Sequence, residues 1–395
     1  MNEFGVTTSG RVRTNVHVYP SPIEFESRML KVTKEIVSRG FARDIVIVGI
    51  AKEGLPRRER LDSKREILRV PRKSAQGLIR KVFHFALWKF RVLRELRDLP
   101  VDMVNCHSLT TLPLCALIAR ANSCRLVYEP HELETETFNS RGFRRFGAKL
   151  VEKALIQRAI RVIAVSDSIA RWYQEEYGLS RVDVVLNVPP RQTVQASRGP
   201  DFRDLLGLDP DAIVFLYQGV LWEDRGVGWL LDAFKVVEPN LHIVFMGFGS
   251  AEDMVKAVAA EHSNIHYHPP VRPEEVVEYA SKADVGFSLL MDDCLGHKFA
   301  LPNKPFAYLQ AGLPVVVSDL PELGAMVDSY GCGWKVGNSA GSIAELVSTI
   351  DLAAISDRSS GVRLAANEFV WERQGESIES IYTEILSGAV LLDSD

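Results

Sequence analysis

Short, nearly continuous apolar runs alternate along the chain with longer stretches in which apolar residues recur every three or four positions. The runs predict buried strands, and the periodic stretches predict helices with one buried face. In the first half we expect strands at 13–19, 44–49, 66–70, 101–106, 125–128, 162–165 and 182–186, and helices at 22–38, 75–97, 112–121, 143–158 and 167–177. Strands that are buried on both faces and alternate with helices indicate a parallel sheet between two helical layers.

A second alternating series begins at residue 213, after the polar, proline-containing stretch 187–200, which we interpret as a linker. We expect strands at 213–217, 241–245, 265–267, 285–289 and 314–319, and helices near 228–236, 251–260, 273–281, 304–310, 342–353 and 374–386. The predicted fold class is α/β, with two doubly wound, Rossmann-like domains over 1–190 and 191–372. Such sheets bind ligands at the carboxyl ends of their strands, so we expect the two domains to face one cleft.

Length and composition agree with two soluble domains. The chain has 395 residues, more than one core usually holds, of which 46% are apolar and 25% charged. No apolar run reaches the roughly 18 residues of a membrane-spanning helix, and the first residues lack the apolar core of a signal peptide. The five cysteines show no CxxC spacing, which favours buried thiols in a reducing, cytoplasmic compartment over a metal site.

The charge of the chain is divided unevenly between its halves. Residues 1–190 hold 33 Lys and Arg against 21 Asp and Glu, whereas the remainder holds 14 against 30. Two basic amphipathic stretches with aromatic residues, 78–91 and 141–149, suit the anionic inner face of a membrane, although core helices with a solvated face explain them as well. No nucleic-acid partner is expected, because no recognition fold is apparent and the second half is acidic.

The stretch 300–321 combines a turn, a short helix and a buried strand. Leu301, Pro302 and Asn303 form the turn, and Lys304 opens the helix. A helix N-terminus offers free N–H groups and a partial positive charge, to which Lys304 adds a full one. The pattern therefore predicts a phosphate-binding site.

Glycines at strand ends indicate further ligand contacts. Gly219 would let a ligand approach the backbone closely, and Arg225 in the next loop can reach a diphosphate, although a solvated arginine fits the pattern equally. Gly247 and Gly249 form a lone G-x-G turn, which is a weak signal by itself.

His131 and Glu132 follow the strand at 125–128. A histidine at a strand end can point into a ligand crevice, where it binds a sugar hydroxyl or shuttles a proton. From the pattern alone, pairing of His131 with a neighbouring glutamate is the simpler interpretation. Between the first strand and the first helix, Ser27 and Arg28 are candidates for the acceptor side of the cleft, and a surface position suits Arg28 equally.

The pattern P-N-K-x-F-x-Y, then G-x-P-V-V and S-D, over residues 302–319 resembles the retaining glycosyltransferases of family 4, which have the two-domain GT-B fold. Residues 219–226, 230–234 and 131–133 are similar to other segments of that family. The resemblance implies transfer of a sugar from a nucleotide-sugar donor to a growing glycan or lipid-linked acceptor, as in polysaccharide biosynthesis. It also implies that residues 373–395 contain a helix that crosses back to the first domain, and that no metal or other cofactor is needed.

The same resemblance assigns roles to single residues. Lys304 and Arg225 would bind the diphosphate, and His131 would orient the donor sugar, with Glu132 as a weaker catalytic candidate. The departing phosphate would itself accept the proton of the acceptor. The expected donor-binding residues are Gly219, Gly247, Gly249, Val271, Leu301, Pro302, Asn303 and Glu322.

Two positions depart from the family pattern. Ala307 stands where the family usually has a ribose-binding glutamate, and Val220 stands where many members have a basic residue. Each departure removes a donor contact, so Glu322 or backbone groups would have to hold the ribose. Two alternatives stay open: a sugar-nucleotide epimerase of the same fold, and a non-catalytic glycosyltransferase-like partner protein.

Overall fold

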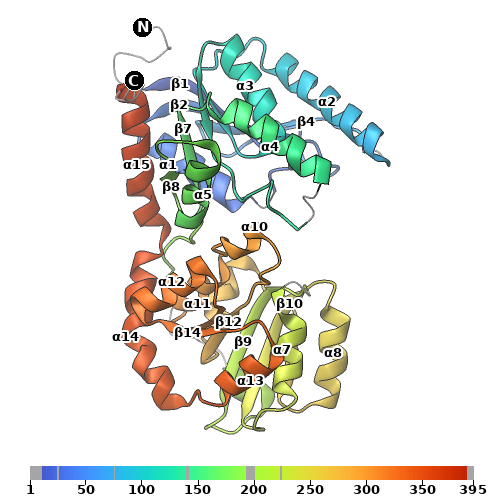
Figure 1. The fold of residues 1–395 in the computed structure, drawn as a ribbon, viewed down its shortest axis with the longest axis vertical. Coiled ribbons are helices and arrows are strands. Elements are labelled where there is room, and N and C mark those ends of the chain that lie inside the picture. Colours follow the sequence, from blue (N-terminus) through green and yellow to red (C-terminus); the bar gives the residue numbers. More distant parts are fainter. Residues whose placement is uncertain are drawn as a thin grey trace. The chain divides into compact units, whose positions relative to one another are not determined.

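The computed structural model describes residues 11–24, 26–74, 76–138, 142–192, 201–222 and 225–388. The chain divides into two compact units, each a sheet with helices packed on it (Figure 1). Unit 1 comprises residues 1–186 together with 374–395, and unit 2 comprises residues 187–373. Most of the expected linker, residues 193–200, lies outside the described residues.

Unit 1 is built on an eight-stranded sheet with the order β3-β4-β2-β1-β5-β6-β7-β8. Only β3 pairs antiparallel with its neighbour among these described strands. The strands are β1 (Val12–Val18), β2 (Ala42–Ile50), β3 (Arg58–Arg60), β4 (Arg65–Val70), β5 (Met103–Cys106), β6 (Arg125–Tyr128), β7 (Arg161–Ala164) and β8 (Asp183–Val184). The helices are α1 (Ser27–Ser38), α2 (Leu78–Glu95), α3 (Leu112–Ala121), α4 (Gly142–Ile156), α5 (Asp167–Tyr177) and α15 (Trp371–Ser387).

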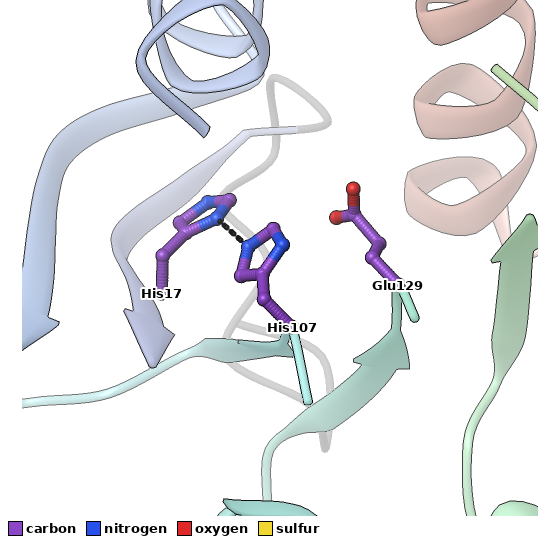
Figure 2. A group of neighbouring side chains, drawn as sticks. All are labelled: His17, His107 and Glu129. Atoms are coloured by element: carbon purple, nitrogen blue, oxygen red, sulfur yellow. Dashed lines mark hydrogen bonds between the residues drawn. The ribbon is translucent and has the colours of Figure 1, made fainter. Parts of the chain in front are cut away.

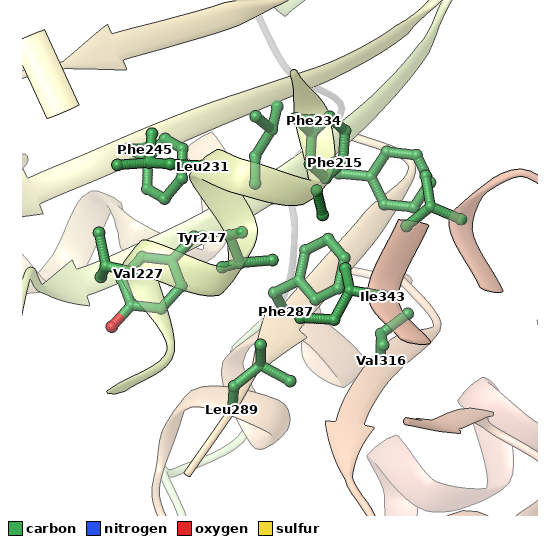
Figure 3. Packing of buried hydrophobic residues seen from close by; sticks show 14 of the residues in the cluster. Phe215, Tyr217, Val227, Leu231, Phe234, Phe245, Phe287, Leu289, Val316 and Ile343 are labelled. Carbon is green, nitrogen blue, oxygen red and sulfur yellow. The ribbon is translucent and has the colours of Figure 1, made fainter. Parts of the chain in front are cut away.

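Unit 2 is built on a six-stranded parallel sheet with the order β11-β10-β9-β12-β13-β14. Its strands are β9 (Ile213–Val220), β10 (Leu241–Phe248), β11 (Ile265–His268), β12 (Val285–Ser288), β13 (Val315–Ser318) and β14 (Gly333–Val336). Its helices are α6 (Phe202–Leu206), α7 (Val227–Phe234), α8 (Glu252–Glu261), α9 (Val276–Ala280), α10 (Leu295–Lys298), α11 (Lys304–Gln310), α12 (Pro321–Tyr330), α13 (Ala340–Val347) and α14 (Leu352–Glu368). Phe215, Phe234 and Phe287 pack at the centre of its core (Figure 3).

The last helix belongs to unit 1 although it follows unit 2 in the sequence. The hydroxyl of Tyr382 accepts a hydrogen bond from the buried Asn105 amide at 2.7 Å. Glu384 pairs with Arg161 of β7 at 2.8 Å, and the inner face of α15 is fully buried. These contacts fix α15 against the first sheet.

The structure differs from the expected elements at several places. The first helix begins at Ser27 rather than at Pro22, because Arg69 of β4 binds the carbonyl oxygens of Pro22 and Ile23 and holds this segment in a loop. Ile23 has a left-handed φ of 54° there. The helix expected at 342–353 is two helices, α13 and α14, because Asp351 caps the second one by accepting from the Ala354 N–H. The strands β3 and β14 and the helices α6, α10 and α12 were not predicted.

Candidate functional site

In each unit the strand order reverses at one point, between β1 and β5 in unit 1 and between β9 and β12 in unit 2. In doubly wound sheets a ligand crevice lies at the carboxyl end of such a reversal. Polar side chains gather at the reversal point of each unit.

Three histidines form a hydrogen-bonded chain at the reversal in unit 1. Nδ1 of His17 on β1 lies 2.8 Å from Nε2 of His107, which directly follows β5 (Figure 2). Nδ1 of His107 lies 3.1 Å from Nε2 of His131, which follows β6. His17 and His107 are fully buried, whereas His131 is partly accessible and packs against the Tyr19 ring at 5.1 Å. The chain therefore runs from the core of the sheet to its surface.

Buried charges surround this chain. Glu129, which is 1% exposed, accepts a hydrogen bond from the amide of Asn105. Arg28 is 3% exposed, and its Nη1 donates to the Val185 carbonyl at 2.7 Å, while Nε and Nη2 have no hydrogen-bond partner among the described residues. Arg28 is thus buried beside the histidines, not on the surface, and contact with an acceptor stays a prediction for it. Ser27 is exposed at the start of α1.

Burial and neighbouring positive charge keep the histidines neutral. Burial lowers the pKa of His107 to about 3, and the Arg28 guanidinium adds to this shift. Burial also lowers the pKa of His17 to about 3, with His107 contributing. The pKa of His131 lies well below its ordinary value for the same reasons, burial first and then His107 and Arg28. A neutral imidazole can donate one hydrogen bond and accept another, as a chain requires.

The two glutamates after His131 differ in their surroundings. Glu132 is exposed, whereas Glu134 is partly buried and accepts hydrogen bonds from the Ser108 hydroxyl, at 2.9 Å, and from the Leu109 N–H. Burial raises the pKa of Glu134 to about 7. Glu134 is therefore poised to exchange a proton near neutral pH.

In unit 2, Lys304 lies over the end of the central strand β9. Its Nζ is 3.8 Å from the centre of the Tyr217 ring, a cation–π contact. Its side chain also crosses Gly219, where an added Cβ would lie 3.2 Å from the lysine Cε. Gly219 has a φ of 108°, which favours glycine. The structure thus brings Lys304 and Gly219 together, and the binding of a phosphate there stays a prediction.

The sequence around Lys304 explains how the lysine is held there. Phe306, Tyr308 and Leu309 are buried on the inner side of α11. The Tyr308 hydroxyl accepts from the Gln218 N–H of β9 at 2.8 Å, and its ring fills the space that a side chain at Gly286 would need. Tyr308 therefore anchors α11 to β9 and β12, which places the lysine at the strand end.

Backbone packing accounts for the G-x-G turn without a ligand. A Cβ on Gly247 would lie 1.8 Å from the Gly219 carbonyl oxygen, and one on Gly249 would lie 2.4 Å from that of Leu221. Both glycines are therefore required by the close approach of β10 to β9, and a donor-binding role remains a prediction.

The other expected donor residues lie on loops of unit 2. Arg225 is partly buried just before α7, and Glu322 lies in the first turn of α12. Val271, Leu301, Pro302 and Asn303 are partly or fully accessible, and Asn303 is the N-cap of α11 without a side-chain cap. Ala307 is partly accessible one turn after Asn303. Their contacts with a ligand remain predictions.

Two groups of side chains in the described part of the chain have metal-binding potential by proximity: His17, His107 and Glu129, and Asp293, Cys294 and His297. In the first group, the two imidazoles share a hydrogen bond and a buried guanidinium adjoins them, which disfavours a dication. In the second group, His297 is bonded to Asp293 at 2.7 Å on an accessible turn.

The sequence pattern did not indicate His17, His107 or Glu134 as site residues. His107 directly follows the run that forms β5, so a histidine at this strand end can point into a ligand crevice as His131 can. His17 lies within β1, where the sequence pattern indicates an ordinary core residue. The raised pKa of Glu134 depends on tertiary burial, and no sequence signal indicates it.

Helices α2 and α4 expose large apolar side chains. Ile79 is 86% and Phe143 is 96% exposed, and Phe83, Phe90 and Phe146 are also exposed. Helix α2 still buries Trp88 and Val92, so its other face belongs to the core. Among the described residues, we find no helix with the length and apolarity needed to span a membrane.

Comparison with known proteins agrees with this architecture. Residues 26–188 match the family model described as Glycosyltransferase Family 4, and residues 212–351 match that described as Glycosyl transferases group 1. No curated protein sequence matches the chain.

Solved structures show the same fold at low sequence identity. Sucrose-phosphate synthase from Thermosynechococcus elongatus is 13% identical, with a TM-score of 0.75 over 95% of this chain and 100% of its own. Anabaena HepE, solved with UDP-glucose, is 13% identical, with a TM-score of 0.70 over 94% of this chain and 99% of its own. WaaG, a glycosyltransferase involved in lipopolysaccharide biosynthesis, is 16% identical, with a TM-score of 0.64 over 95% of this chain and 100% of its own. The two family matches, one in each unit, and the shared fold show that the chain belongs to the family 4 type of glycosyltransferases with the GT-B fold.

Proposed function

We propose that this glycosyltransferase uses a nucleoside diphosphate sugar as its donor and retains the anomeric configuration of the transferred sugar. The observation that carries the proposal is the position of Lys304 over Gly219 at the end of β9. There the ammonium group would meet a diphosphate that lies against backbone without a side chain. HepE, which shares the fold, has been solved with UDP and with UDP-glucose, which supports this donor class.

In this proposal Arg225 is the second cation on the diphosphate, and the leaving phosphate accepts the proton of the acceptor hydroxyl. His131 hydrogen-bonds the donor sugar and orients it for attack. The histidine would act as a neutral group, because burial and Arg28 hold its pKa well below the ordinary value. No protein nucleophile and no metal is required by these roles.

We propose a glycan or lipid-linked molecule as the acceptor. A pocket of about 490 Å³ in unit 1 lies between α2, the start of α3 and α4, with Phe85, Pro113 and Val151 among its apolar lining. Lys89, Arg144 and Glu134 also line it. Apolar walls with two cations suit an acceptor that combines a lipid with a phosphate. The exposed apolar residues of α2 and α4 would then dock on an anionic membrane.

The test is a screen of nucleoside diphosphates and their sugars by thermal shift, followed by product analysis. We expect stabilisation by one nucleoside diphosphate and release of that diphosphate when donor and acceptor are both present. NMR of the product at the anomeric carbon distinguishes retention from inversion. Conversion of the donor into an epimer without an acceptor would instead identify an epimerase.

A further inference from the structure

The hydrogen-bonded chain of histidines has a direction that bears on the reaction. His131, the candidate that meets the sugar, uses Nε2 to bind His107, which leaves Nδ1 as the ring nitrogen for a ligand. His107 uses both ring nitrogens, one for His131 and the other for His17. Each neutral imidazole carries one N–H, so the bond at one end of His107 determines the bond at the other.

We propose that His107 and His17 are positioning residues that hold His131 in one tautomer and one orientation, so that Nδ1 of His131 always presents the same hydrogen-bonding group to the sugar. This inference rests on the proposed function for the role of His131. The chain itself does not, because both of its bonds and the burial of its inner members are structural observations.

Burial couples the tautomers of the three rings, and the surroundings of His17 select between the two arrangements that keep both bonds. His17 and His107 have no exposed surface, so water cannot replace the shared hydrogen bonds. Nε2 of His17 is buried without a hydrogen-bond partner among the described residues, which favours the arrangement in which this nitrogen carries no proton, because a buried N–H without a partner is the rarer case. The titratable and charged groups facing the chain are Tyr19 beside His131, Arg28 from α1 and Glu129 after β6.

A metal ion held by His17, His107 and Glu129 is the competing explanation for the cluster in Figure 2. It would occupy the two nitrogens that now lie 2.8 Å apart and share a proton. Metal analysis of the purified full chain decides this point. A stoichiometric ion that is lost in His17→Gln would overturn the proposal.

The direct test reads tautomers by ¹⁵N NMR of the full chain labelled at histidine, which has nine such residues. We expect one neutral tautomer of His131 between about pH 6 and 8 in the native protein. In His107→Leu, His131 should show averaged tautomers and titrate within that range. The matched control is His242→Leu, which breaks the similar 3.1 Å bond to His266 in unit 2 and should leave the His131 signals unchanged. Identical His131 signals in the native protein and His107→Leu would overturn the proposal.

Kinetics supply the second readout. His107→Leu should lower kcat at least about tenfold while the donor KM stays within about twofold. His107→Asn keeps a polar atom near the Nδ1 position and should recover part of this loss. If His107→Leu does not fold, the tautomer of His131 in the native protein and the turnover of His107→Asn still test the positioning role. Full turnover in His107→Leu, alongside an inactive His131→Ala, would overturn the positioning role. Full turnover in His131→Ala would overturn the proposed function instead and leave the NMR result unaffected.

Discussion

Lys304 illustrates how a residue role follows from its neighbours. The lysine lies over Tyr217 and Gly219 because Tyr308, four residues later, is bonded to β9. The motif that indicated this site contains both Lys304 and Tyr308, so local sequence carried the information. The histidine chain joins residues about 90 positions apart, and only the folded sheet brings them together.

Replacing Lys304 tests the diphosphate site. Lys304→Met keeps an unbranched aliphatic side chain but removes the charge, and should weaken nucleoside diphosphate binding by roughly 1.5–3 kcal/mol, the value of a charge-assisted hydrogen bond. Arg225→Ala should have a similar effect in calorimetry. The control is Lys235→Met, whose ammonium pairs with Asp232 at 2.8 Å on the surface of the same unit. Affinity within about twofold of native in both site variants would contradict the assignment.

Ala307 tests the register of α11 with the family motif. Ala307→Glu should tighten nucleotide binding, because a carboxylate would accept hydrogen bonds from the ribose hydroxyls. The gain should be roughly 1.5–3 kcal/mol and should vanish with a 2′,3′-dideoxy nucleotide. An equal gain with the dideoxy compound would show that the glutamate does not reach the ribose.

Glu134 predicts a pH dependence of stability. Its pKa is about 7 in the folded chain against an ordinary 4.5, so the folded state holds the proton more tightly. The resulting stabilisation is present below about pH 4.5 and is lost as the pH rises towards 7, at up to about 1.4 kcal/mol per pH unit. Chemical denaturation at pH 5 and pH 7 should show this loss relative to Glu134→Gln, which keeps an acceptor for the Leu109 N–H. The prediction would be refuted if the free energy of unfolding changed with pH in the same way in the native protein and in Glu134→Gln.

At the scale of elements, the sequence was most reliable where a helix carries its own signals. The bounds of α3, α5 and α11 agree with those expected, since α5 has the Ser166 cap and α11 follows the Pro302 turn. The start of α1 could not be predicted, because Arg69 acts on it from 46 or 47 residues away. The short strands β3 and β14 depend on pairing with β4 and β13.

Helices α2 and α4 should bind acidic vesicles. Arg145 and Lys149 both pair with Glu136, so replacing either of them would also disturb the fold. The test variants therefore lie elsewhere on the two helices. Arg80→Glu with Lys81→Glu, and separately Phe143→Ser, should reduce co-sedimentation with anionic vesicles, at about 1 kcal/mol for each charge near the surface.

The matched control for these variants is Leu364→Ser on the exposed face of α14 in unit 2. Binding of the native protein should weaken as salt rises through physiological strength. If the native protein does not sediment with acidic vesicles even at low salt, the exposed residues have another purpose.

At the scale of the whole molecule, the proposed roles in binding and turnover are divided between the two units. His131 belongs to unit 1, whereas Lys304 and Gly219 belong to unit 2. His131→Ala should therefore lower turnover strongly and leave nucleoside diphosphate affinity almost unchanged, because the residue would meet only the sugar. Calorimetry and initial rates measured on the same preparation separate the two effects. An equal loss of nucleotide affinity would show that His131 has a different place.

The attachment of α15 to unit 1 also has a consequence for synthesis. The chain emerges in sequence order, yet the partners of Asn105 and Arg161 lie at Tyr382 and Glu384, after the whole of unit 2. Unit 1 therefore cannot complete its core during translation until unit 2 has already been made. Domains usually fold from the N-terminus as they leave the ribosome. Here the segment that completes the earlier unit is made last, so we expect unit 2 to be able to complete its core before unit 1 does.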